Sequence, residues 1–185
     1  MLTSADERFH ETGGLAGRSP AQVKERLLGV DALLGSWGPA IKELVAAACD
    51  DDDQEQGPGA VADVRPLYRL PVGQAWAHRR GATLVGDAAH LMCPWAGEGV
   101  NLAMWDALLL SRAIAKAHDG SAGDEDPALA FQSILDPLMA EFEIDMVARA
   151  REKAEEALSN GEMLFGEDGA RAFADFFRQF GPPPE

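Results

Sequence analysis

The residues whose types and spacing could do chemistry lie between Gly86 and Asn101. Asp87 follows a short apolar run, and Gly97 and Gly99 precede a long apolar stretch with helical spacing. A carboxylate at the carboxyl end of a strand can accept hydrogen bonds from ligand hydroxyls. Glycines at a helix start leave backbone N–H groups open to an anion or an electron-rich carbonyl, since these groups have no intrahelical partner. The pattern therefore predicts a cofactor-binding turn, although a Gly-Asp pair alone is commonly a turn without a ligand.

Metal chemistry is not indicated by the spacing of the candidate ligands. His90 and Cys93 are close to Asp87 in sequence, but no second pair with zinc-ligand spacing accompanies them. The run of aspartates at 50–53 lacks the alternating ligands and the glycine of a calcium loop. We expect no metal site, and we expect His90 to be a turn residue that packs near the cofactor. For Trp95, a wall of the cofactor or substrate pocket and ordinary packing stay open as alternatives.

A strand and a helix must position this turn. Residues 82–85, Ala-Thr-Leu-Val, are too apolar to alternate, which predicts a central strand buried on both faces. A second short strand is predicted over RPLYRLPV, ended by Pro71 and Gly73. Residues 99–118 are apolar nearly all round, which predicts a helix buried between layers.

The other segments read as helices joined by loops. Ser19 and Gln22 form a capping-box pattern at the start of a helix over about 20–34, and a shorter helix follows Pro39. Residues 49–62 and 118–127 are predicted loops, the first because its aspartates repel one another. Asp126 should cap a long helix that ends at Asn160-Gly161. The closing amphipathic helix carries phenylalanines expected to be core or a buried interface: Phe173, Phe176, Phe177 and Phe180.

Composition and charge narrow the class of protein. The chain has 185 residues, 46% of them hydrophobic and 25% charged, as in an ordinary globular protein. The net charge of −15 argues against nucleic acid as a partner, because no basic stripe is available to neutralise phosphates. The sequence shows no signal peptide and no membrane-spanning run, and its two cysteines imply no disulfide framework. We expect a cytoplasmic protein with no membrane partner.

The stretch GDAAHLMCPWAGEGVNLAMWDALLLSRAI resembles the second flavin-contacting motif of the group A FAD-dependent monooxygenases. These are the para-hydroxybenzoate hydroxylase-like enzymes, including the tetracycline-modifying branch. The family pattern of Gly-Asp-Ala-Ala-His, a proline, Gly-x-Gly-x-Asn and a helical Asp-Ala pair is matched here at residues 86–90, 94, 97–101 and 106–107. The flanking sequences LYRLPVGQAW and EFEIDMVARAREKAEE are similar to family segments more weakly.

The resemblance implies FAD as the cofactor and assigns residues to it. Asp87, in the turn begun by Gly86, would hydrogen-bond the ribityl chain. The isoalloxazine ring would be lined by the residues of the following loop and helix start: Pro94, Ala96, Gly97, Gly99, Val100 and Asn101. NAD(P)H would be the reductant, and oxygen would pass to a small organic substrate. No catalytic acid or base is assigned within this stretch, because the cofactor carries the chemistry.

The chain departs from the family pattern upstream of the motif. Family members begin with a strand, a Gly-x-Gly-x-x-Gly turn and a helix. Residues 57–62 fit this pattern loosely, but they follow an acidic tract, contain a proline and lead into no helix. The resemblance implies an α/β fold, namely part of a Rossmann-like FAD/NAD(P)-binding domain that is mostly helical and lacks its N-terminal βαβ unit. Residues 1–62 would then be a helical segment and acidic linker at the end of the substrate domain, and 63–185 the C-terminal part of the FAD-binding domain.

Different functions remain compatible with the sequence. The first is the FAD-binding portion of a monooxygenase that hydroxylates a small organic molecule. The second is a non-catalytic remnant or interaction module that binds no cofactor alone. The third is one half of a split enzyme, completed by a missing N-terminal half or a partner chain. FAD binding with and without that half discriminates among them.

Overall fold

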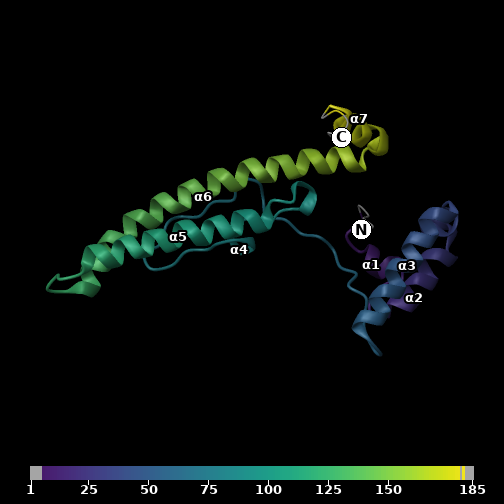
Figure 1. The fold of residues 1–185 in the computed structure, drawn as a ribbon, viewed down its shortest axis with the longest axis horizontal. Helices are drawn as coiled ribbons and strands as arrows, with labels where there is room; N and C mark the ends of the chain where they lie inside the picture. Colours follow the sequence, from purple (N-terminus) through teal and green to yellow (C-terminus); the bar gives the residue numbers. More distant parts are fainter. Residues whose placement is uncertain (1–5, 180, 182–185) are drawn as a thin grey trace. The chain divides into compact units, whose positions relative to one another are not determined.

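The computed structural model describes residues 6–179 and 181, and nearly all of its regular structure is helical (Figure 1). The chain divides into two compact units, residues 1–67 and residues 68–185. The first holds α1 (Phe9–Thr12), α2 (Pro20–Gly29), the π-helical turn η1 (Asp31–Gly35) and α3 (Pro39–Gln56). The second holds α4 (Asp87–His90), the 3₁₀ turn η2 (Pro94–Ala96), α5 (Gly99–Ser121), α6 (Pro127–Phe165) and α7 (Gly169–Arg178).

The first unit packs α2 against α3 around a small apolar core. Its buried members are Leu15, Val23, Leu27 and Leu34. The predicted capping box of α2 is confirmed, since Ser19 Oγ accepts from Gln22 N at 3.3 Å and Gln22 Oε1 accepts from Ser19 N at 3.1 Å. Val64 also packs on this core, and Ala62 N donates to Arg18 O at 2.8 Å. Residues just beyond the predicted linker therefore belong to the first unit.

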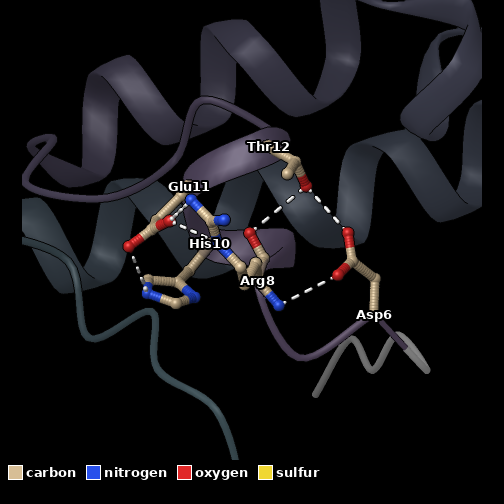
Figure 2. A network of polar contacts seen from close by, with 5 residues as sticks. All are labelled: Asp6, Arg8, His10, Glu11 and Thr12. Atoms are coloured by element: carbon tan, nitrogen blue, oxygen red, sulfur yellow. Dashed lines mark hydrogen bonds and ion pairs between the residues drawn. The ribbon is translucent and has the colours of Figure 1, made fainter.

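Polar contacts hold the short α1 together at its surface (Figure 2). Arg8 Nη2 lies 2.7 Å from Glu11 Oε2, and Thr12 Oγ1 donates to Asp6 Oδ2 at 2.9 Å. These side chains are exposed, so water and salt screen the ion pair and it contributes about 0–1 kcal/mol. The network holds the local path of the chain around α1.

The prediction of a loop over 49–62 is wrong in its first half, because α3 continues through the aspartates to Gln56. Successive residues in a helix point about 100° apart, so the carboxylates face different directions and repel one another less than in an extended chain. Asp50 also forms an ion pair with Lys24 of α2. The helix ends at Gly57, whose φ of +77° lies in the left-handed region that favours glycine.

The second unit is built on α5 and α6, which run side by side and are joined by a short loop (Figure 1). Asp126 caps α6 as predicted, accepting from Leu129 N at 3.1 Å, with Pro127 at the first helical position. The core between α4 and α6 contains Ala89, Phe142 and Met146. This core fixes α4, and with it the predicted cofactor turn, against α6.

Neither predicted strand forms among the residues that the structure describes. Residues 65–72 and 82–85 carry no strand pairing, and the one β-bridge recorded there joins Arg79 to Ala82. A strand is stable only when its backbone groups pair with a neighbour, and residues 6–179 offer these segments no neighbouring strand. Leu84 and Val85 are accordingly exposed, not buried on both faces.

Both long helices extend further than predicted. The helix α5 runs to Ser121, into the predicted loop at 118–127. The helix α6 continues through Asn160 and Gly161 to Phe165. A glycine inside a helix costs about 1 kcal/mol relative to alanine, and here tertiary contacts of Asn160 and Gly161 with Trp95 outweigh that preference.

The expectation that α5 is buried between layers is wrong, and so is a core position for the phenylalanines of α7. A buried interface for these phenylalanines stays a prediction. The helix α5 packs on α6 along one side only, and Val100 and Met104 are 72% and 68% exposed. The phenylalanines of α7 form edge-to-face pairs with one another, Phe173 with Phe177 at 4.7 Å and Phe176 with Phe177 at 5.5 Å between ring centroids. They are nevertheless exposed and form no part of the core of this unit. Phe180 lies outside the described residues.

Candidate functional site

The predicted cofactor turn begins at Gly86, which precedes α4. Its φ of +58° and ψ of −141° are accessible to glycine and costly for other residues. A Cβ atom at this position would lie 3.2 Å from the Cβ of Ala103 on α5. The turn therefore approaches α5 closely, and the carboxylate of the next residue, Asp87, is left exposed to solvent.

A buried carboxylate on α5 holds this turn in place. Asp106 has no exposed surface, and its Oδ2 accepts a hydrogen bond from Gly86 N at 3.2 Å. The same oxygen lies 2.6 Å from His90 Nε2 at the end of α4. Its other oxygen, Oδ1, accepts from Arg149 Nη1 of α6 at 3.2 Å. One side chain thus connects both ends of α4 to α5 and α6.

The partners of Asp106 offset the cost of burying its charge. A carboxylate removed from water is stable only when donors or opposite charges replace its hydration. The Arg149 guanidinium supplies that charge, and its Nε also donates to Asp145 Oδ2 at 2.8 Å. His90 Nδ1 and Arg149 Nη2 are buried and have no hydrogen-bond partner among the described residues. His90 is therefore a structural donor to Asp106, consistent with its prediction as a packed turn residue.

The loop after α4 leads to the exposed N-terminus of α5. Gly97 ends η2 with a φ of +69° and donates its N–H to Pro94 O at 3.0 Å. A Cβ atom added at Gly97 or Gly99 would meet nothing within 4 Å. The first backbone bond of α5 runs from Leu102 N to Glu98 O, so within residues 6–179 no acceptor pairs with the amides of its first turn. These amides belong to Gly99, Val100 and Asn101.

This arrangement fits the flavin that the resemblance implies. The open space above the glycines permits close approach of a planar ring to the backbone. The unpaired amides and the positive end of the α5 dipole favour an electron-rich carbonyl or an anion there. Asp87 presents a free carboxylate on the preceding turn, suited to ligand hydroxyls.

The structure gathers most of the predicted site residues into one accessible stretch. Pro94, Gly97, Val100 and Asn101 are exposed, and Ala96 and Gly99 are partly exposed. Gly86 is buried, so its role is to shape the turn. Asn101 Nδ2 donates to Glu98 Oε2 at 3.2 Å, which holds its amide at the helix start. Their contacts with a cofactor stay predictions.

The sequence reasoning gave no role to Asp106 and Arg149. The available signal was weak, since Asp106 interrupts an apolar helical stretch and a charge in such a place must find a partner. Arg149 follows it by 43 residues, and nothing in the local pattern connects the two.

A second missed group is His78, which bridges two acidic side chains of α6. Its Nδ1 lies 2.8 Å from Glu143 Oε2, and its Nε2 lies 3.3 Å from Asp136 Oδ1. The hydrogen bond to Glu143, followed by that to Asp136, raises the pKa of the His78 imidazole above its ordinary value. The contact fastens the chain before the turn onto α6.

Two further findings concern other classes of site. In the described part of the chain, no three histidine, cysteine or acidic side chains converge as metal ligands would. Of the helices described, none is long and apolar enough to cross a lipid bilayer.

Comparisons with known proteins agree with this geometry. The model of the FAD binding domain family matches residues 60–126, a segment that contains α4, η2 and α5. The monooxygenase asqM of Emericella nidulans is 36% identical over 159 residues, which are 84% of this chain and 35% of the relative. The monooxygenase penA of Penicillium thymicola is 32% identical over 82% of this chain, which corresponds to 33% of the length of penA. The FAD-dependent monooxygenase phnB of Penicillium herquei is 36% identical over 50% of this chain and 20% of its own.

The chain spans about a third of the length of the first two of these relatives. The segment that matches the FAD binding domain family includes the Gly86 turn and the start of α5. The monooxygenases match a longer stretch that includes most of both structural units. Residues 60–126 thus match the FAD binding domain family, and most of the chain is similar to part of these monooxygenases.

Proposed function

We propose that this chain supplies the flavin-ring side of the active site in a monooxygenase that hydroxylates a small organic molecule. The observation that carries the proposal is the row of unpaired amides at the start of α5, beside glycines with open space around them. Asp87 would accept hydrogen bonds from the ribityl hydroxyls, and the backbone from Pro94 to Asn101 would line the ring.

The contribution of the chain to the reaction is electrostatic and positional. In this family FAD supplies the redox chemistry: NAD(P)H provides two electrons, and O₂ provides one oxygen atom to the substrate and one to water. The amides of Gly99, Val100 and Asn101 would face the edge of the ring that becomes negative on reduction. Fixed backbone dipoles stabilise such charge without reorganising.

The finer fold assignment belongs to the same proposal. We infer that further polypeptide, either a missing N-terminal half or a partner chain, covers α5 and pairs with residues 82–85, completing a Rossmann-like sheet. The support is the apolar surface that these segments expose, which includes Leu84, Val85, Met104, Trp105 and Leu108. Exposed large apolar side chains grouped on neighbouring segments are typical of an interaction site. A cytoplasmic location is part of this proposal.

FAD titration tests the proposed function. The chain is purified, and flavin fluorescence and absorbance are followed as FAD is added, alone and with a polypeptide carrying the Gly-x-Gly-x-x-Gly half. We expect weak or no uptake alone and saturable uptake on mixing, because the ADP-binding turn lies outside this sequence.

Substrate turnover then tests the activity. In the reconstituted protein, NAD(P)H oxidation should depend on FAD, and the small organic substrate should stimulate it when a set of such compounds is screened. Absence of flavin uptake in both mixtures would overturn the proposal. FAD uptake without NAD(P)H oxidation would support FAD binding by the chain and contradict the proposed monooxygenase activity.

A further inference from the structure

The predicted flavin-ring loop is held at a second place, by the C-terminal third of α6. Asn160 Nδ2 donates a hydrogen bond to the carbonyl oxygen of Trp95 at 3.2 Å. The indole of Trp95 packs edge-on against Phe165, with 4.9 Å between ring centroids. These contacts join η2 to α6 over a sequence separation of 65 residues.

Gly161 makes this approach possible. A Cβ atom at position 161 would lie 2.9 Å from Trp95 Cδ1 and 3.2 Å from Nε1. Real Cβ atoms do not approach an aromatic ring to 2.9 Å, so any larger residue would push the indole away. The helix accepts a glycine that costs it about 1 kcal/mol in local preference. The indole occupies the space that this glycine leaves.

The contact complements the one made by Asp106. Arg149 fastens the Gly86 end of the motif, and Asn160 fastens the Pro94–Ala96 end. The two side chains are about three turns apart on α6, which places them on the same face. One face of α6 therefore sets both ends of the surface that the flavin would occupy.

We propose that Asn160 and Gly161 are positioning residues for the flavin-ring loop, acting through Trp95 to fix the backbone of Pro94–Ala96. This inference rests on the proposed function for its link to flavin, and on the structure alone for the contact itself. It concerns residues outside the matched domain segment of 60–126.

Hydrogen exchange of the chain without FAD tests the contact. The reporter is the Gly97 amide, which donates to Pro94 O at the end of η2. Asn160→Ala should speed exchange there by about fivefold, the equivalent of losing one hydrogen bond of about 1 kcal/mol. Ser159→Ala, an exposed neighbour on α6, is the matched control and should leave exchange at Gly97 unchanged.

Gly161→Ala gives a sharper result, because it should move two regions in opposite directions. Alanine stabilises a helix by about 1 kcal/mol over glycine, so exchange in the last turns of α6 should slow by about fivefold. Exchange at Gly97 should become faster, since the new Cβ displaces the indole. In a Trp95→Ala background, Gly161→Ala should slow exchange in α6 and leave Gly97 unaffected. If Gly161 mattered only for the stability of α6, Gly161→Ala would not slow exchange in α6 while making exchange at Gly97 faster.

The flavin arm uses the FAD-loaded, reconstituted protein. Asn160→Ala should shift the visible absorption of bound flavin and weaken FAD binding by about fivefold, whereas Ser159→Ala should do neither. Unchanged exchange at Gly97 in both Asn160→Ala and Gly161→Ala would overturn the contact. If hydrogen exchange at Gly97 changes but the absorption spectrum of bound flavin does not, the contact exists and does not position the flavin ring. If the parent protein takes up no FAD, the proposed function fails, and the exchange results still decide the contact.

Discussion

Replacing Asp106 by Asn tests whether the buried carboxylate holds the cofactor turn. The substitution keeps the size of the side chain and an oxygen that can accept from Gly86 N. It removes the charge that His90 and Arg149 share, and it points an amide N–H₂ group toward one of these donors. Because Asp106 is fully buried, water cannot replace the lost partner.

The magnitude follows from these contacts. Hydrogen bonds to charged groups contribute about 1.5–3 kcal/mol each, and breaking a buried pair costs about 3–5 kcal/mol. Arg149 is partly exposed and keeps its bond to Asp145, so its share is the smaller one. We expect Asp106→Asn to lower the free energy of unfolding of the second unit by about 2–4 kcal/mol.

Urea unfolding followed by tryptophan fluorescence measures this loss of stability in a Trp37→Phe background. Trp37 lies in the first unit, and the remaining tryptophans, 76, 95 and 105, all report on the second. With a slope of about 2 kcal/mol per molar urea, the middle of the usual range, the midpoint should fall by about 1–2 M. Asp145→Asn is the control, because Asp145 meets the same arginine at an exposed position and should cost below about 1 kcal/mol. Equal losses for the two variants would refute the reasoning.

Three further outcomes are expected. Gly86→Ala should destabilise the second unit by about 1–3 kcal/mol, because the positive φ at this position is strained for alanine and the new Cβ would contact Ala103. A urea midpoint equal to that of the parent protein would contradict this expectation. Asp87→Ala should weaken FAD binding to the reconstituted protein by about 1–3 kcal/mol, and it should leave stability unchanged because the carboxylate is exposed. Asp119→Ala replaces another exposed acid and should leave FAD affinity unchanged. Equal FAD affinities for the two variants would contradict the role given to Asp87. Contact with Glu143 raises the folded pKa of His78, so its contribution is complete below its unfolded pKa of about 6.5 and is lost as pH rises through the folded value. The stability difference between parent and His78→Gln should shrink as pH rises above about 6.5, and a difference that stays constant as pH rises would exclude the linkage.

Helix starts were predictable from the sequence because they depend on neighbours in the chain. Ser19 and Asp126 each accept from a backbone amide three residues later, and Pro20 and Pro127 already have the backbone angle of a first helical turn. The backbone geometry of the predicted cofactor turn was predictable for the same reason, since its glycines determine local conformation.

Features set by distant residues were not predictable. Residues 82–85 have strand composition, but a strand needs a partner, and none is present in the described part of the chain. The helix α6 passes through Gly161 because Trp95, far away in sequence, fills the space beside it. The roles of Asp106 and Arg149 follow only from the packing of α5 on α6.

The residues of α6 that contact the predicted cofactor turn lie far from it in sequence, and this separation delays their contact during synthesis on the ribosome. Asn160 follows Trp95 by 65 residues, and His78 precedes Glu143 by the same separation. At a translation rate of about 5–20 residues per second, the cofactor turn waits about 3–13 s for the helix that fastens it. During this interval the side of α5 that packs on α6 is uncovered on the nascent chain, which makes α6 the element that first removes part of the apolar surface of α5 from chaperones and from aggregation.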